Sequence, residues 1–223
     1  MTITYKVVGP DGTVYDAGAD CGTLTSYSET IANRVSGTAI GSTATTAPSS
    51  NVYKFVGWYT DAACNTPVVA ADGTVTNNVT FVPAKEAANA EVNPPVPAAY
   101  AAATFYAKFE YNLTSLTIVK KGVNTTKDPG VSFVFNVDGK SEGDDTNLDV
   151  AINQNGSVTI YGLTVGNKYD VTEKLGNWRY SATDSDQEIT LVADASENVV
   201  TFENVRGSDK WLDGDCYAEN KFN

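Results

Sequence analysis

A lysine, a glutamate and an asparagine each follow two apolar residues on one face of an expected strand. Alternate residues of a strand point to the same side of its sheet. In LTIVKKG this alternation puts Lys120 in line with the leucine and the isoleucine. In YDVTE it puts Glu173 in line with the tyrosine and the valine, and in VVTFENV it puts Asn204 in line with the valine and the phenylalanine. Each apolar face therefore ends in one polar group.

These three groups predict a reaction if they meet. An unpaired charge in an apolar interior costs several kcal/mol, so we expect a buried lysine and a buried glutamate to lie together. Burial disfavours both charges, so the pair can exist as a neutral amine and a carboxylic acid. A neutral Lys120 could attack the side-chain amide of Asn204 while Glu173 shuttles the proton to the leaving ammonia. The product would be a Lys120–Asn204 isopeptide bond.

Two alternatives stay open at this point. Lys120 could be a surface lysine with Lys121 pointing outward beside it, and Glu173 and Asn204 could be ordinary residues at strand ends. A shift of one residue in strand phase would exchange the two faces. The second alternative concerns the acceptor, since Asn220 in YAENKF also lies near the end of the chain.

The second half of the chain resembles a known family in these motifs. The L-x-I-x-K, Y-x-V-x-E and V-x-F-x-N motifs, with VSFVFNVDG and SVTIYGLTVGNKYDVTEKLGNWRY between them, are similar to the B-type domains of Gram-positive collagen adhesins and pilins (Cna B-type). The resemblance runs from about Thr114 to Arg206. It implies a prealbumin-like, immunoglobulin-like β-sandwich over residues 113–223. It also implies a Lys120–Asn204 isopeptide bond formed with the assistance of Glu173.

The sequence patterns in the first half of the chain predict a separate module over residues 1–112. TITYKVVGPDGTVYDAG reads as a β-hairpin, and SYSETIANRV as a short helix with Ile31 and Val35 as an apolar pair. The run KFVGWYT and the strand ATFYAKFEY at residues 103–111 resemble the internalin B-repeat family of bacterial surface proteins. That resemblance is carried by Phe55, Gly57 and Trp58 with the following tyrosine, and it implies a β-grasp-like fold. The whole chain is therefore expected to be mainly β.

An insertion, VPAKEAANAEVNPPVPAAYAAA, interrupts this second resemblance. Its alanines and prolines leave little to bury, so we expect an exposed loop. FVPAK is faintly similar to the lysine motif through which sortases join pilin subunits, with Lys85 as the candidate, although an ordinary solvated lysine explains it better. Trp58, Trp178, Trp211 and the tyrosines could stack on sugars, but core packing is the better expectation for aromatics that alternate in strands.

Composition excludes several classes of function. The net charge is −12, which opposes nucleic acid and anionic membranes as partners. The chain has no histidine, so the usual catalytic triads and His-rich zinc sites cannot form. Cys21, Cys64 and Cys216 have no CxxC spacing, and whether Cys21 and Cys64 pair stays open. We expect no cofactor, no metal and no enzyme acting on an external substrate.

These features predict an extracellular structural protein. We expect a stalk or adhesin segment of a Gram-positive cell-wall-attached or pilus-like surface protein, with neighbouring domains of the parent protein as partners. The alternative is a module that binds a glycan or a host matrix protein. The chain has no run of about 18 apolar residues and no signal-peptide start, so we expect export and anchoring segments to lie outside it.

Overall fold

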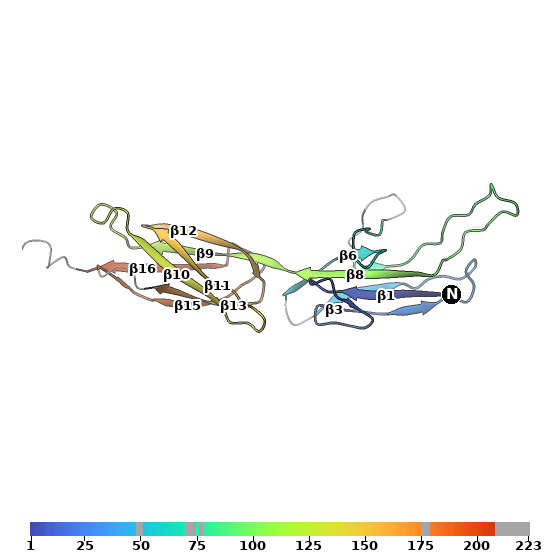
Figure 1. Cartoon of the computed structure of the whole chain (residues 1–223), viewed down its shortest axis with the longest axis horizontal. Helices are drawn as coiled ribbons and strands as arrows, with labels where there is room; N and C mark the ends of the chain where they lie inside the picture. Colours follow the sequence, from blue (N-terminus) through green and yellow to red (C-terminus); the bar gives the residue numbers. More distant parts are fainter. Residues whose placement is uncertain (48–50, 70–74, 76–77, 175–178, 208–223) are drawn as a thin grey trace, which may run out of the picture. The chain divides into compact units, whose positions relative to one another are not determined.

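The computed structural model describes residues 1–47, 51–69, 75, 78–174 and 179–207 (Figure 1). Within these residues every regular element is a β-strand, which confirms the prediction of a mainly β chain. The chain divides into two compact units, Met1–Asn112 and Leu113–Asn223. None of the described residues belongs to a helix with the length and apolar character needed to cross a lipid bilayer.

The first unit is built on a mixed sheet in which the first strand runs parallel to the last. The order is β2-β1-β8-β6, with β4 also paired to β1. β1 and β8 are parallel, and the other pairs are antiparallel. The strands are β1 (Thr2–Val8), β2 (Val14–Tyr15), β4 (Ser28–Thr30), β6 (Tyr53–Tyr59) and β8 (Ala103–Tyr111). The predicted opening hairpin is β1 and β2, and the predicted strand at residues 103–111 is β8.

A smaller sheet packs with this one to form the core of the first unit. Its order is β3-β5-β7, with β3 (Gly22–Leu24), β5 (Ser42–Thr46) and β7 (Thr80–Phe81). The centre of the core is aromatic: Trp58 is 1% exposed and meets the ring of Tyr5 edge to face, with centroids 5.9 Å apart. A fully buried indole cannot stack on a glycan. The idea that Trp58 forms a sugar platform is therefore wrong, and its role is packing.

The predicted helix at residues 26–35 is also wrong, because this segment joins the sheet. Ser28–Thr30 forms β4 against β1, and the amide of Ile31 donates to the carbonyl of Met1. The Glu29 carboxylate accepts hydrogen bonds from the Tyr5 hydroxyl at 2.5 Å and from the amide of Ile40 at 2.7 Å. Ile31 is buried whereas Val35 is 45% exposed, so the expected apolar pair does not share one face. Long-range pairing overrides the local pattern here.

The insertion forms an exposed arm whose two sides are joined by isolated bridges. Isolated bridges join Glu86 to Ala99 and Asn89 to Val96. Figure 1 shows the arm, in green, extending beyond the sheets of its own unit. Most of its residues are exposed, as expected, but the ring of Tyr100 is buried in the core of the unit. The arm is therefore fastened at its base.

The second unit is a β-sandwich of two four-stranded sheets (Figure 1). One sheet has the order β12-β9-β16-β14, and its strands are β12 (Gly156–Thr164), β9 (Leu113–Lys121), β16 (Val199–Arg206) and β14 (Tyr180–Ala182). The other has the order β11-β10-β13-β15, and its strands are β11 (Asn147–Asn153), β10 (Ser132–Gly139), β13 (Lys168–Lys174) and β15 (Asp186–Thr190). Only the β9–β16 pair is parallel among these described strands.

Alternating side chains from both sheets fill the sandwich. Apolar residues at every second position of β9, β10, β13 and β16 point inward, as the two-residue period of a strand requires. The buried apolar residues at these positions are Leu116, Ile118, Phe133, Phe135, Val137, Tyr169, Val171, Val200 and Phe202. The inward alternation of β9, β13 and β16 continues beyond these residues, and the next inward position on each strand is polar.

Candidate functional site

The three polar residues singled out from the sequence lie together in the core of the sandwich. Lys120 is on β9 and Asn204 is on β16, which are parallel neighbours in one sheet. Glu173 is on β13, in the facing sheet. The exposed fractions are 1% for Lys120, 6% for Glu173 and 3% for Asn204. Lys121, the next residue along β9, is exposed, so it is Lys120 that faces the core.

Glu173 bridges the amine and the amide. Its Oε1 accepts a hydrogen bond from Asn204 Nδ2 at 2.5 Å, and its Oε2 lies 3.6 Å from Lys120 Nζ. Nζ itself donates to the carbonyl oxygens of Lys121 at 3.1 Å and of Phe202 at 3.4 Å. One carboxyl group therefore contacts both the group that would attack and the group that would leave.

The surroundings make the charged form of Lys120 less favourable than it would be in water. Burial lowers the pKa of Lys120 below its ordinary value, and the nearby negative charge of Glu173 opposes this only in part. The Nζ atom lies 4.7 Å from the centre of the Phe133 ring, and the side chain of Lys120 has no exposed surface. A lysine with a lowered pKa spends more of its time as the free amine, which is the nucleophilic form.

Two oxygens of the site have no hydrogen-bond partner among the described residues. They are Asn204 Oδ1, the oxygen of the carboxamide, and Glu173 Oε2. Leaving a buried acceptor without a donor costs about 1–3 kcal/mol, and such groups are rare in proteins. These unpartnered oxygens therefore make the cluster less stable than a fully hydrogen-bonded one would be.

The sequence reasoning missed a glycine that allows β9 to end against Asn204. Gly122 has φ +81°, and a Cβ atom added there would lie 2.1 Å from the backbone oxygen of Asn204. Any other side chain would displace β16 at Asn204. The sequence feature that could have indicated this close approach is the glycine directly after the two lysines.

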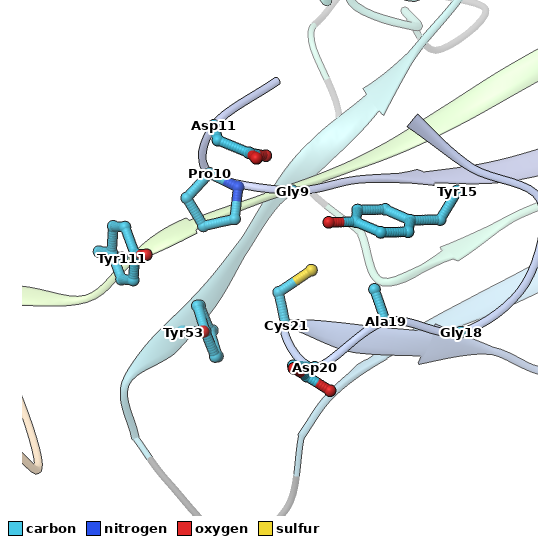
Figure 2. A pocket seen from close by; sticks show the side chains of 10 residues that line it. All are labelled: Gly9, Pro10, Asp11, Tyr15, Gly18, Ala19, Asp20, Cys21, Tyr53 and Tyr111. Carbon is cyan, nitrogen blue, oxygen red and sulfur yellow. The ribbon is translucent and has the colours of Figure 1, made fainter. Parts of the chain in front are cut away.

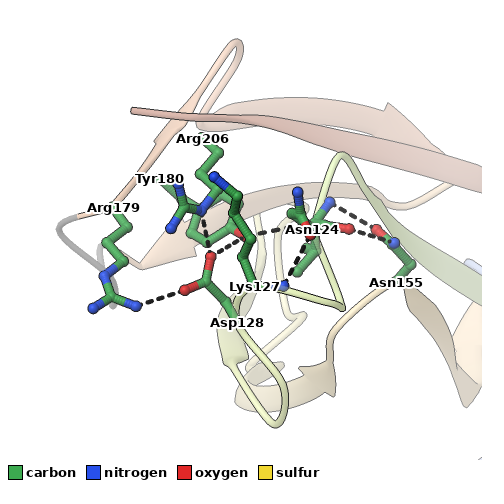
Figure 3. Close-up of polar contacts among 8 residues, drawn as sticks. Asn124, Lys127, Asp128, Asn155, Arg179, Tyr180 and Arg206 are labelled. Carbon is green, nitrogen blue, oxygen red and sulfur yellow. Dashed lines mark hydrogen bonds and ion pairs between the residues drawn. The ribbon is translucent and has the colours of Figure 1, made fainter. Parts of the chain in front are cut away.

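A second polar cluster holds the ends of β9 and β16 (Figure 3). Asp128, in the connection after β9, accepts hydrogen bonds from Arg206 Nε at 2.6 Å, from Arg179 Nη1 at 2.6 Å and from the Tyr180 hydroxyl at 2.8 Å. The hydroxyl of Tyr180 accepts in turn from the amide of Asn124. Arg206 follows Asn204 by two residues, so this Asp128 cluster fixes the strand end that carries the amide.

We expect the Asp128 cluster to make the second unit acid-sensitive. The hydrogen bond from Arg206, helped by those from Tyr180 and Arg179, holds the pKa of Asp128 well below its usual range despite burial. A carboxyl whose pKa is lowered on folding stabilises the protein above its unfolded pKa of about 4 and loses this contribution as the pH falls further. The melting temperature of the wild type should therefore drop below about pH 4.

The variant Asp128→Asn tests whether the stability of the second unit falls with pH for this reason. Its melting temperature should be lower than that of the wild type at pH 7, and the difference should shrink as the pH falls to 2. Asp145→Asn removes an exposed carboxylate of the same unit and is the matched control, with a curve that should follow the wild type. Parallel curves for the wild type and Asp128→Asn over the whole range would show that the cluster does not titrate on unfolding.

The other described residues that were named from the sequence do not join the site. Lys85 donates to the carbonyl of Val35 at 2.5 Å and lies 5.3 Å from the ring of Tyr100, so its ammonium is engaged within the first unit. Cys21 and Cys64 are free, buried thiols. Asn220, Cys216, Trp178 and Trp211 lie outside the described residues.

Comparison with known proteins finds resemblance only among solved structures. No protein-family model matches the sequence, and no curated protein matches it. A C-terminal fragment of the pilus adhesin SpaC from Lactobacillus rhamnosus GG is 12% identical, with 92% of this chain and 96% of that chain covered and a TM-score of 0.41. The major pilin (T-13) from Streptococcus pyogenes is 14% identical, with 74% and 65% covered and a TM-score of 0.33.

A third solved structure is much longer than this chain. The pilus-presented adhesin Spy0125 (Cpa) is 17% identical over 48% of this chain, at a TM-score of 0.36, and the match covers only 31% of that adhesin. All three TM-scores are low, so these similarities establish neither a shared fold nor a shared function.

Proposed function

We propose that this chain is a structural segment of an extracellular Gram-positive surface or pilus-like protein, locked by an intramolecular isopeptide bond between Lys120 and Asn204. The observation that carries the proposal is the buried contact of one carboxyl group, Glu173, with both the amine and the amide. In this proposal residues 113–223 are a Cna B-type domain and residues 1–112 an internalin B-repeat-like, β-grasp-like domain. The motifs named above support these assignments.

The reaction needs only the three side chains. A proton passes from the ammonium of Lys120 to the carboxylate of Glu173, which leaves a neutral amine and a carboxylic acid. Nζ then attacks Cγ of Asn204, and a bond forms between these two atoms. Glu173 delivers a proton to Nδ2 and takes one from Nζ, the Cγ–Nδ2 bond breaks, and ammonia leaves. The sum is amine plus primary amide giving secondary amide plus ammonia, with no other reactant consumed.

The position of the bond suits a protein under tension. β9 begins the second unit and β16 is the last described strand, and the proposed bond joins them near the carboxyl end of each. Force applied at the two ends of the unit would pass from β9 through the bond to the end of β16. The hydrogen bonds of the sheets would carry little of it, and the segment between residues 120 and 204 could not extend.

Single-molecule stretching of the full chain tests this function directly. Without the bond, unfolding should release the segment between Lys120 and Asn204, which adds about 280–300 Å of extended chain. We expect no such lengthening in the wild type and the full step in Lys120→Met. The first unit is the same in both variants and supplies an internal reference step. A wild type that extends by the same step as Lys120→Met would refute the proposed mechanical role.

The competing function is binding of a glycan or a host matrix protein through the aromatic residues of the first unit or through the insertion. Trp58 is buried, so a glycan-binding role cannot use its ring. We therefore propose the structural role alone for the Lys120, Glu173 and Asn204 site.

A further inference from the structure

A pocket unrelated to the proposed bond lies in the first unit, beside the turn that joins β1 to β2 (Figure 2). Its volume is about 370 Å³. The side chains that matter for its chemistry are three tyrosines, two aspartates and one cysteine: Tyr15, Tyr53, Tyr111, Asp11, Asp20 and Cys21. All of them belong to residues 1–112, so the pocket is complete within one unit.

Aromatic rings stand on two sides of the pocket. Tyr53 on β6 and Tyr111 on β8 lie directly opposite one another in the register of the sheet. Their rings stack with centroids 5.4 Å apart and an angle of 27° between the planes. Figure 2 shows Tyr15 on the other side, with Cys21 between it and the stacked pair. Burial raises the pKa of Tyr53, so its ring stays neutral and keeps the negative face of a phenol.

The charge of the pocket is entirely negative. Of the ten described residues that line it, two are aspartates and none is a lysine, arginine or histidine. The amide and the hydroxyl of Thr13 donate to Asp11 at 2.9 and 2.7 Å, and these bonds lower the pKa of its carboxyl group. Asp11 therefore stays ionised. An anionic ligand would be repelled, and the chain's net charge of −12 adds to that effect.

Cys21, a free thiol at the edge of the core of the first unit, lies in the wall of the pocket beside the two aspartates. Cys21 is 4% exposed and forms no disulfide, and no described side chain is its hydrogen-bond partner. Figure 2 shows its Sγ directed into the pocket. Gly9 keeps the space open, since a Cβ atom there would lie 3.1 Å from Asp11 Oδ1 and 3.3 Å from the ring of Tyr15.

We propose that this pocket binds an organic cation, of the methylated ammonium type. Such a group has a positive charge spread over methyl groups, donates no strong hydrogen bond, and is held by the faces of aromatic rings. The three tyrosines supply these faces, and the two carboxylates supply the compensating charge. The cation could be free in solution or part of a larger molecule, and the chemistry of recognition is the same.

Choline and its uncharged isostere 3,3-dimethyl-1-butanol test the proposal by calorimetry or by NMR titration of the full chain. Choline should bind saturably, and the uncharged analogue should bind at least about tenfold more weakly, because it has the same shape without the charge. Equal binding of the two compounds, or no saturable binding of choline, would overturn the proposal.

Variants then locate the site. Asp20→Asn and Tyr111→Leu should each weaken choline binding by about three- to thirtyfold, the range expected for one charge or one ring face. Asp20 is exposed and Tyr111 is 48% exposed, so the fold should tolerate these changes. Tyr111→Phe keeps the ring and should bind like the wild type. Tyr161→Leu removes a tyrosine that is 79% exposed on the second unit and should have no effect. Loss of binding in Tyr161→Leu, or none in Asp20→Asn and Tyr111→Leu, would place the site elsewhere.

The reactivity of the Cys21 thiol gives an independent measurement of choline binding. Choline should slow alkylation of Cys21 by iodoacetamide, measured by peptide mass, while alkylation of Cys64 in the same sample should not change. Both cysteines are buried, and Cys64 does not line this pocket, which makes it an internal control. Equal rates at Cys21 with and without choline would count against binding in this pocket.

Discussion

The variant Lys120→Met should have a much lower melting temperature than the wild type. The proposed bond closes a loop of about 85 residues, which the chain-entropy treatment of cross-links values at about 4–5 kcal/mol. For a unit of this size a loss of 1 kcal/mol lowers the melting temperature by about 4–8 °C, so we expect a decrease on the order of 20 °C. Scanning calorimetry of the full chain measures it, with the first unit melting as before.

Methionine keeps the length of the lysine side chain, so that the change removes the amine with little change in volume. Lys121→Met is the matched control, since it removes a neighbouring lysine that is exposed. It should melt within a few degrees of the wild type. A similar small decrease in both variants would show that no covalent bond contributed to the stability of the wild type.

The variant Glu173→Ala should fold but form the bond at least about a hundredfold more slowly, which is the lower end of the usual contribution of general acid–base catalysis. Without the carboxyl group nothing accepts the proton of Lys120 or delivers one to the Asn204 amide. The measurement is the fraction of uncross-linked chain, read by intact mass at intervals after purification. We expect this variant to keep its full sequence mass at the start.

Glu203→Ala is the control for this experiment. Glu203 precedes Asn204 on β16, but its side chain is exposed, so it should cross-link like the wild type. Full-speed cross-linking in Glu173→Ala would show that a different group moves the proton. Slow cross-linking in Glu203→Ala instead would show that the exposed carboxylate does so.

The burial of the three polar residues could be predicted because it depends on local alternation. Once Leu116 and Ile118 are placed inward, the two-residue period also places Lys120 inward, and the same holds for Glu173 and Asn204. Neither the bond nor its chemistry follows from that alternation alone, and both stay predictions. The mainly β character of the chain followed from the same patterns.

Features that depend on distant partners could not be predicted in this way. The helix expected at residues 26–35 failed because Glu29 and Ile31 bond to β1, the 39–41 segment and Met1, which the local pattern does not report. Asp128 meets Arg206 across 78 positions of sequence, and Tyr53 meets Tyr111 only through the pairing of β6 with β8. No spacing rule within one segment predicts such contacts.

The mass of the intact wild-type chain tests the central claim most directly. The proposal predicts a mass lower than that of the sequence by one molecule of ammonia, and a branched peptide joining Lys120 to Asn204 after digestion. Lys120→Met and Asn204→Ala should each show the full mass of their sequences, and Asn220→Ala should show the same loss as the wild type. A wild-type chain with its full sequence mass would contradict the bond. A branch at Asn220 would contradict the choice of acceptor.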